Sequence, residues 1–91
     1  MHIGWREDKR RINLRKHGFG FVDAAELFTG ATVTIEDDRF DYGEQRWLTF
    51  GLLRGRVVVV AYVERGVQLH LISLRKAEKH EAIAFFQQIG D

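Results

Sequence analysis

The spacing of apolar and polar positions changes along this chain, and the changes separate helical from β-strand regions. Residues 5–17 predict a surface helix, because Glu7 and Asp8 would lie in its first turn, basic residues crowd its last turn and Gly18 follows. That order of charges complements the helix dipole. A second, shorter helix is predicted where apolar residues recur at i, i+3, i+4 and i+7, at Phe21, Ala24, Ala25 and Phe28.

The middle of the chain predicts four β-strands. Residues 32–36 form a short segment rich in β-branched residues. In residues 46–53, Leu48, Phe50 and Leu52 alternate with Trp47, Thr49 and Gly51, which indicates a strand with one face in the core. Residues 57–63 are apolar without interruption, which is typical of a central strand covered on both faces. A turn at Arg65-Gly66 precedes residues 67–74, which alternate again. The last three strands would form an antiparallel meander.

The end of the chain predicts a third helix, which starts near Arg75 and carries apolar residues at positions 82, 85, 86 and 89. The expected fold class is therefore α+β, with two N-terminal helices, a four-stranded mainly antiparallel sheet and a C-terminal helix.

Composition adds limits on class and location. The 91 residues, 45% of them hydrophobic, suit a single domain over residues 1–91 with one core. There is no cysteine, which excludes disulfides and thiolate metal sites and suits a reducing cytoplasm. The longest apolar run, residues 57–63, is far shorter than a membrane span. We expect a cytoplasmic protein that neither enters a membrane nor carries a cofactor or metal.

The net charge of +1 conceals a basic run between residues 9 and 16 that ends beside His17. Such a patch on a nearly neutral chain suits a polyanion bound on one face, although a solvated helix face remains an alternative. At its end, Lys16 and His17 could bind phosphate and move a proton, because histidine titrates near neutral pH. The alternative role for these cations is to neutralise the helix C-terminus.

A second group of polar residues lies where the last two predicted strands meet. In a hairpin turning at Arg65-Gly66, the side chains expected to share one face are Tyr62, Glu64, Gln68 and His70. Ser73 and Arg75 would fall on the side of Leu69 and Leu71 unless a β-bulge intervenes. Glu64 and Arg65 could also be ordinary solvated turn charges.

RNA is a suitable substrate for such groups. It supplies its own nucleophile, the 2′-hydroxyl, so cleavage needs only a base, an acid and cations near the phosphate, with no metal. Aromatic side chains could stack on a splayed base. Trp47 is favoured for this role because it shares a face with Thr49 and Gly51 rather than with Leu48 and Phe50. Phosphate-binding loops, dinucleotide fingerprints and nucleophile elbows are absent from the sequence.

Short motifs occur in a fixed order along nearly the whole chain. The first half carries Asp8-Lys9, Asn13-Leu14-Arg15-Lys16-His17-Gly18, Phe21, Ala24-Ala25 and Phe28. The second half carries Arg46-Trp47-Leu48-Thr49-Phe50-Gly51, Tyr62-Val63-Glu64-Arg65, and Ile72-Ser73-Leu74-Arg75-Lys76-Ala77 with Glu81. Together these motifs resemble the BrnT-type toxins of type II toxin–antitoxin systems.

The resemblance implies a RelE-like fold and a ribonuclease that inhibits translation. It also implies a BrnA-like ribbon-helix-helix antitoxin as partner, a heterotetramer with that antitoxin, and contact with operator DNA only through it. A non-catalytic module that binds RNA or protein with the same basic face is the alternative function, and it predicts association without cleavage.

The resemblance also suggests residue roles. The catalytic candidates are His17, Glu64, Arg65 and Arg75, with His17 or Glu64 as base and the arginines on the phosphate. The candidates for RNA binding are Lys16, Trp47, Tyr62, His70, Ser73 and Lys76. Two positions depart from the family pattern: His70 stands where an arginine is usual, and Leu74 where a small residue is usual. We expect the cationic candidates to meet in one pocket sized for a single phosphodiester.

Overall fold

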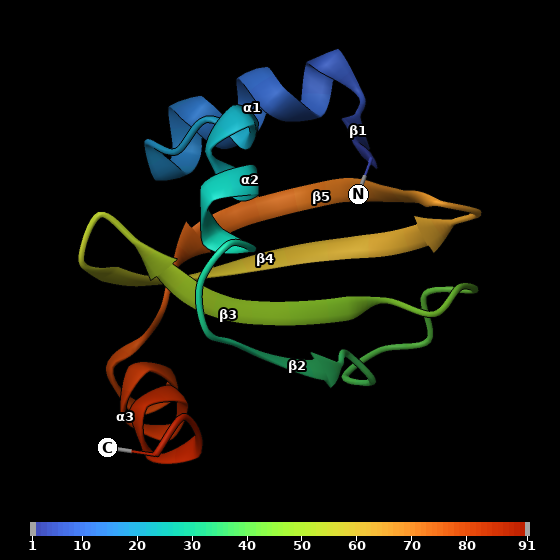
Figure 1. The fold of residues 1–91 in the computed structure, drawn as a ribbon. Helices are drawn as coiled ribbons and strands as arrows, with labels where there is room; N and C mark the ends of the chain where they lie inside the picture. Colours follow the sequence, from blue (N-terminus) through green and yellow to red (C-terminus); the bar gives the residue numbers. More distant parts are fainter. Residues whose placement is uncertain (1, 91) are drawn as a thin grey trace.

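The computed structural model describes residues 2–90, which form one mixed sheet with helices packed around it (Figure 1). The elements in chain order are β1 (His2–Trp5), α1 (Glu7–His17), a 3-10 turn (Phe21–Asp23), α2 (Ala24–Leu27), β2 (Thr32–Glu36), β3 (Trp47–Leu53), β4 (Arg56–Arg65), β5 (Gln68–Lys76) and α3 (Lys79–Gln88). The predicted α+β class is confirmed. The predicted four-stranded sheet is wrong, because the sheet has a fifth strand.

The strand order is β1-β5-β4-β3-β2, with β1 parallel to β5 and every other pair antiparallel. The added strand shortens the first predicted helix, which begins at Glu7 instead of Trp5. Trp5 pairs with Leu71 in the sheet, and its ring packs edge-on against Phe21 at a centroid distance of 5.9 Å. Pairing covers part of the outer edge of β5, which would otherwise present unpaired backbone groups.

The last helix also begins later than predicted. β5 continues through Lys76, which pairs with Val58 of β4, so Arg75 belongs to the strand. α3 starts only after Glu78, whose side chain accepts a hydrogen bond from the backbone N–H of Glu81 while the Glu81 side chain accepts one from the backbone N–H of Glu78. This capping box satisfies backbone donors that the first helical turn leaves free.

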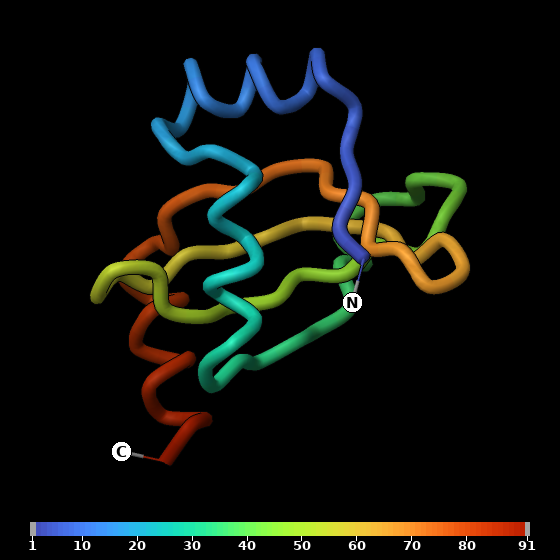
Figure 2. Tube along the Cα trace, turned by 45° about the horizontal axis from the view of Figure 1, so that its top comes forward, coloured from blue at the N-terminus to red at the C-terminus, as the bar shows by residue number. Residues whose placement is uncertain are grey.

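The two faces of the sheet bury separate apolar clusters. On one face, α2 and the 3-10 turn cover residues of β3, β4 and β5, and the cluster includes Phe21, Leu27, Val58, Val60 and Leu74. On the other face, α3 packs through Phe85 against Leu48, Phe50, Val57 and Val59. Figure 2 shows α2 crossing in front of the strands, with α3 away from it at the lower left. The two-sided burial predicted for residues 57–63 is confirmed.

A glycine in β3 allows α2 to approach the sheet. A Cβ atom on Gly51 would lie 2.8 Å from Leu27 Cγ and 3.3 Å from the Leu27 carbonyl oxygen. We expect Gly51→Ala to lower the free energy of unfolding by about 1–3 kcal/mol, because the added methyl group overpacks this contact. Urea unfolding measures the loss, and Gly30→Ala is the matched control, since a Cβ there meets nothing within 4 Å. Equal losses in both variants would contradict the prediction.

Between residues 2 and 90, no helix has the length and apolar character needed to cross a membrane.

Candidate functional site

A β-bulge in β5 decides which polar side chains meet. The register between β4 and β5 shifts next to Tyr62, and Ile72 is left without a partner in β4. The extra residue reverses the alternation of the strand, so Ser73 and Arg75 face the same side of the sheet as His70. The sequence left open that a β-bulge would move Ser73 and Arg75 away from the side of Leu69 and Leu71, and this bulge is present. Four polar side chains of β5 share the face on which α3 packs: Gln68, His70, Ser73 and Arg75.

The second half of the outer edge of β5 is covered by α1, and Asn13 makes the connection. Asn13 is buried, with 4% of its surface exposed. Its side-chain oxygen accepts the backbone N–H of Leu74 at 3.0 Å, and its amide nitrogen donates to the carbonyl oxygens of Leu74 at 2.9 Å and Phe19 at 3.1 Å. The side chain thus replaces the neighbouring strand that β5 lacks here, and it fixes the C-terminal half of α1 beside the bulge.

The first candidate site, which we call the His17 hollow, lies between α1 and the bulge. It has a volume of about 190 Å³ and is lined by Lys9, Ile12, Asn13, Lys16, His17, Ile72 and Ser73. His17 is the last residue of α1 and is half-buried. Burial is the main cause that lowers its pKa, and the positive charges of Lys16 and Arg75 lower it further. Its imidazole is therefore neutral at pH 7 and able to accept a proton.

A second depression, the Arg65 hollow, adjoins the first and shares Lys9 and Ile72 with it. It has a volume of about 200 Å³, and its lining residues are Arg6, Lys9, Glu44, Arg46, Arg65, His70, Leu71 and Ile72. Burial lowers the pKa of His70, the charges of Arg65 and Arg6 add to this effect, and Glu44 opposes it. The expectation of one pocket is wrong: Lys16 and Arg65 line two neighbouring hollows. Both hollows lie along α1 and β5.

Arg75 is held by a carboxylate in the first turn of α3. Its two terminal nitrogens donate to the two carboxylate oxygens of Glu81 at 2.8 and 3.0 Å, and this ion pair raises the pKa of Arg75 and lowers that of Glu81. The guanidinium therefore joins β5 to the start of α3. Its charge still acts on His17, but the pair of donors that would grip a phosphate is already occupied.

Residues 5–81 match the model of a family described as the ribonuclease toxin, BrnT, of type II toxin–antitoxin systems. The chain belongs to the BrnT family. The matched span contains every residue that lines the two hollows. A search of curated proteins gives no match.

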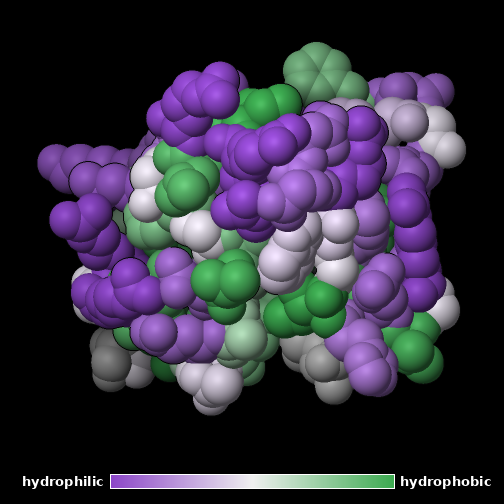
Figure 3. Space-filling view, turned by 90° about the horizontal axis from the view of Figure 1, so that it is seen from above, coloured by the Kyte–Doolittle hydropathy of each residue, from purple (hydrophilic) through white to green (hydrophobic). Residues whose placement is uncertain are grey.

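Membership of the BrnT family confirms the resemblance found in the sequence. The family description supports ribonuclease activity, and a type II system implies an RNA substrate and an antitoxin partner. On this BrnT chain, hydrophilic side chains cover most of the face seen from the side of α1, with isolated apolar residues between them (Figure 3).

The register of the strands places four predicted site residues on the opposite face of the sheet, where α2 packs: Trp47, Tyr62, Glu64 and Lys76. Tyr62 pairs with Leu71, so neither Tyr62 nor Glu64 shares a face with His70 and Gln68, as had been expected. Tyr62 is 6% exposed, and its hydroxyl lies 2.7 Å from that of Thr49. Trp47, the partner of Tyr62 in β3, packs against the same buried cluster. The Tyr62 ring therefore belongs to the core, and the partly buried Trp47 ring packs against it.

The remaining predicted residues divide between the hollows and the open surface. Lys16 and Ser73 line the His17 hollow, whereas His70 lines the Arg65 hollow. Lys76 is exposed at the end of β5 and lines neither of them. Of the two residues predicted as the base, only His17 lies in a hollow with other candidates, because Glu64 is exposed on the α2 side of the sheet.

Sequence reasoning missed several lining residues of this BrnT site. Lys9, Asn13 and Lys16 recur at i, i+4 and i+7, so helical spacing could have placed them on one face of α1. Arg46 and Glu44 gave no such signal, because they lie in an irregular segment between β2 and β3.

That segment is ordered by one buried carboxylate. Asp37 accepts hydrogen bonds from Arg39 Nε at 2.7 Å, from the second Arg39 nitrogen at 2.9 Å and from the Tyr42 hydroxyl at 3.0 Å. Arg39 is the main cause that lowers the pKa of Asp37 to about 2. Further along, the Arg46 guanidinium lies 4.0 Å from the centre of the Tyr42 ring. This chain of contacts presents Arg46 and Glu44 to the Arg65 hollow.

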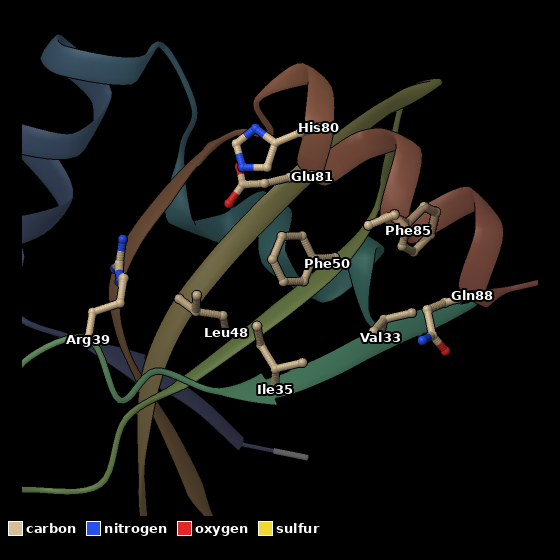
Figure 4. A pocket seen from close by; sticks show the side chains of 10 residues that line it. Val33, Ile35, Arg39, Leu48, Phe50, His80, Glu81, Phe85 and Gln88 are labelled. Atoms are coloured by element: carbon tan, nitrogen blue, oxygen red, sulfur yellow. The ribbon is translucent and has the colours of Figure 1, made fainter.

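A third depression, larger than either hollow, lies between α3 and strands β2 and β3 (Figure 4). It has a volume of about 390 Å³, and its floor is apolar, formed by Val33, Ile35, Leu48, Phe50 and Phe85. At its rim, Arg39 is paired with Asp37, and Glu81 is paired with Arg75. Apart from His80, this groove offers apolar surface and charges that are already paired, so the two smaller hollows are the better candidate site.

Proposed function

We propose that the His17 hollow cleaves RNA by attack of the substrate's own 2′-hydroxyl, without a metal ion. The observation that supports this most is a half-buried histidine whose pKa is lowered, placed beside Lys16 and Ser73 in one hollow. A neutral imidazole, an ammonium group and a hydroxyl are what this reaction needs, because the nucleophile comes with the substrate.

In the proposed reaction, His17 accepts the proton of the 2′-hydroxyl as that oxygen attacks the phosphorus. The O2′–P bond forms, the P–O5′ bond breaks, and the Lys16 ammonium donates a proton to the leaving 5′-oxygen. The products are a 2′,3′-cyclic phosphate and a free 5′-hydroxyl. The Lys9 charge and the Ser73 hydroxyl stabilise the phosphoryl oxygens, on which negative charge grows in the transition state.

Two catalytic candidates have other roles in this proposal. Arg75 acts through its charge, which favours the neutral form of His17, and through the ion pair with Glu81 that positions the end of β5. Glu64 is not part of the reaction, because its carboxylate lies on the face of the sheet opposite Arg65 and His70.

We also propose that the partner is a BrnA-like ribbon-helix-helix antitoxin, which forms a heterotetramer with this chain in the cytoplasm and prevents inhibition of translation. Membership of a type II toxin family supports an antitoxin partner. The sequence resemblance implies that this antitoxin is BrnA-like. Expression of this chain alone is expected to slow growth. Co-expression with the neighbouring gene, which should encode the antitoxin, is expected to relieve this defect and to yield one co-purified complex. Normal growth with the chain alone would count against this role.

Cleavage is tested with purified protein and RNA in the presence of a chelator. The expected result is shorter RNA ending in 2′,3′-cyclic phosphates, and RNA with 2′-O-methyl groups should bind but stay intact. Cleavage that occurs only after a divalent cation is added would contradict the metal-independent mechanism. Binding of unmodified RNA without any cleavage would instead support the non-catalytic alternative.

A further inference from the structure

The Arg65 hollow contains more positive charge than its one acidic residue neutralises. Its cationic side chains are Arg6, Lys9, Arg46 and Arg65, with His70 beside them. Arg6 forms an ion pair with Asp8, which does not line the hollow. Glu44 is the acid among the lining residues, so an anion from outside the protein would find unpaired positive charge here.

Glu44 already binds two of these cations. One carboxylate oxygen accepts a hydrogen bond from Arg46 Nε at 3.3 Å, and the other lies 3.9 Å from a terminal nitrogen of Arg65. The Glu44 side chain is 39% exposed, and water weakens ion pairs that are this exposed. A phosphate, which carries its charge on several acceptor oxygens, can therefore displace this carboxylate.

The cations would keep their positions if Glu44 moved away. Arg46 lies over the Tyr42 ring, and the Tyr42 hydroxyl donates to the buried Asp37 carboxylate. Arg65 ends β4 and pairs with Gln68 of β5, so its backbone is fixed by the sheet. The hollow is therefore organised before an anion binds, which lowers the cost of binding.

We propose that the Arg65 hollow is a second phosphate subsite, which holds a phosphate next to the scissile one on the same RNA strand, and that Glu44 occupies it until RNA binds. The shared residues Lys9 and Ile72 make the two hollows continuous, so one strand can pass from the first into the second. This inference rests on the proposed function in one respect, namely that the strand bound in the two hollows is RNA.

The test measures affinity for a short single-stranded 2′-deoxy oligonucleotide, which lacks the nucleophile, over a range of salt concentrations. Each phosphate contact on a single strand contributes about 0.7 to the slope of log affinity against log salt. Arg65→Gln is expected to reduce that slope by about 0.7. Arg56→Gln, at the exposed opposite end of β4, is the matched control and should leave it unchanged. Equal slopes for the two variants would overturn the subsite.

Removal of the competing carboxylate gives a second measurement. Glu44→Gln is expected to bind the oligonucleotide about two- to fivefold more tightly at low salt, the range that corresponds to an exposed ion pair. Glu36→Gln removes an exposed acid at the end of β2 and controls for the change in net charge. Equal gains in both variants would show that Glu44 does not occupy the subsite. Tighter binding of a polyglutamate peptide than of the oligonucleotide would overturn the assignment to phosphate.

The subsite and the cleavage reaction can fail separately. Slopes that follow the expected pattern in a protein that leaves RNA intact would preserve the subsite and overturn the proposed nuclease. Cleavage of RNA together with equal slopes for Arg65→Gln and Arg56→Gln would preserve the proposed nuclease and overturn the subsite. Circular dichroism of each variant checks that the fold is intact, which is expected because all four substituted side chains are at least one-third exposed.

Discussion

Replacing His17 by alanine is expected to lower kcat/KM for RNA cleavage by about 10²–10⁴-fold, the range that general acid–base catalysis contributes. Because burial lowers the pKa of the His17 imidazole, this ring is the base of its hollow, and its loss leaves no general base beside Lys16 and Ser73. His80→Ala is the matched control, because His80 is exposed on α3 and lines the apolar groove instead. Similar rates in the two variants would remove His17 from the reaction.

The pH profile distinguishes a base from a residue that only supports the fold. Because burial, Lys16 and Arg75 lower the pKa of His17, kcat/KM of the native protein should fall only when the pH drops below the ordinary histidine value of ~6.5. Lys16→Gln removes a neighbouring positive charge, so it should move this acidic limb to higher pH as well as lower the rate. A limb at the same pH in both proteins would show that Lys16 does not act on the base.

The sequence was informative where one element determines its own environment. The uninterrupted apolar run of residues 57–63 predicted a central strand, and β4 contributes buried valines to both clusters. The first helix was predicted from local signals, namely acids in its first turn and cations in its last, which act through the helix dipole without tertiary contacts. The identity of the family followed from motifs spread along the chain.

The sequence did not predict the features that depend on contacts with a distant segment of the chain. β1 has only four residues, and its pairing with β5 depends on contacts more than sixty positions away, as between Trp5 and Leu71. Trp47 and Tyr62 do share a face, but local sequence could not reveal that α2 covers it. The bulge at Ile72 carries no glycine or other local signal, although it alone decides that Ser73 and Arg75 face the side of His70.

The candidate site depends in particular on Asn13, whose role is invisible in a helical pattern. Asn13 occupies the second turn of a surface helix and appears there as one more polar residue. In the structure its amide binds the N–H and the carbonyl of Leu74, a residue with no exposed surface. Water cannot readily replace a partner at such a position, so these two backbone groups depend on this side chain.

Asn13→Ala is therefore expected to lower the free energy of unfolding by about 2–6 kcal/mol, since two buried backbone groups lose their partner at ~1–3 kcal/mol each. This is a large share of the ~5–15 kcal/mol that typically stabilises a domain. Urea unfolding measures the loss, and Arg11→Ala, an exposed position on the same helix, should change stability by less than about 0.5 kcal/mol.

Asn13→Asp refines this test, because it keeps an acceptor for the Leu74 N–H but brings a charged oxygen towards the carbonyls of Leu74 and Phe19. The folded state should favour the protonated carboxyl and raise its pKa above the unfolded value of ~3.9. The variant should then be nearest to the native stability below that value, and its deficit should grow as the pH rises through the folded pKa. A deficit that does not depend on pH would show that these two carbonyls do not need the Asn13 donor.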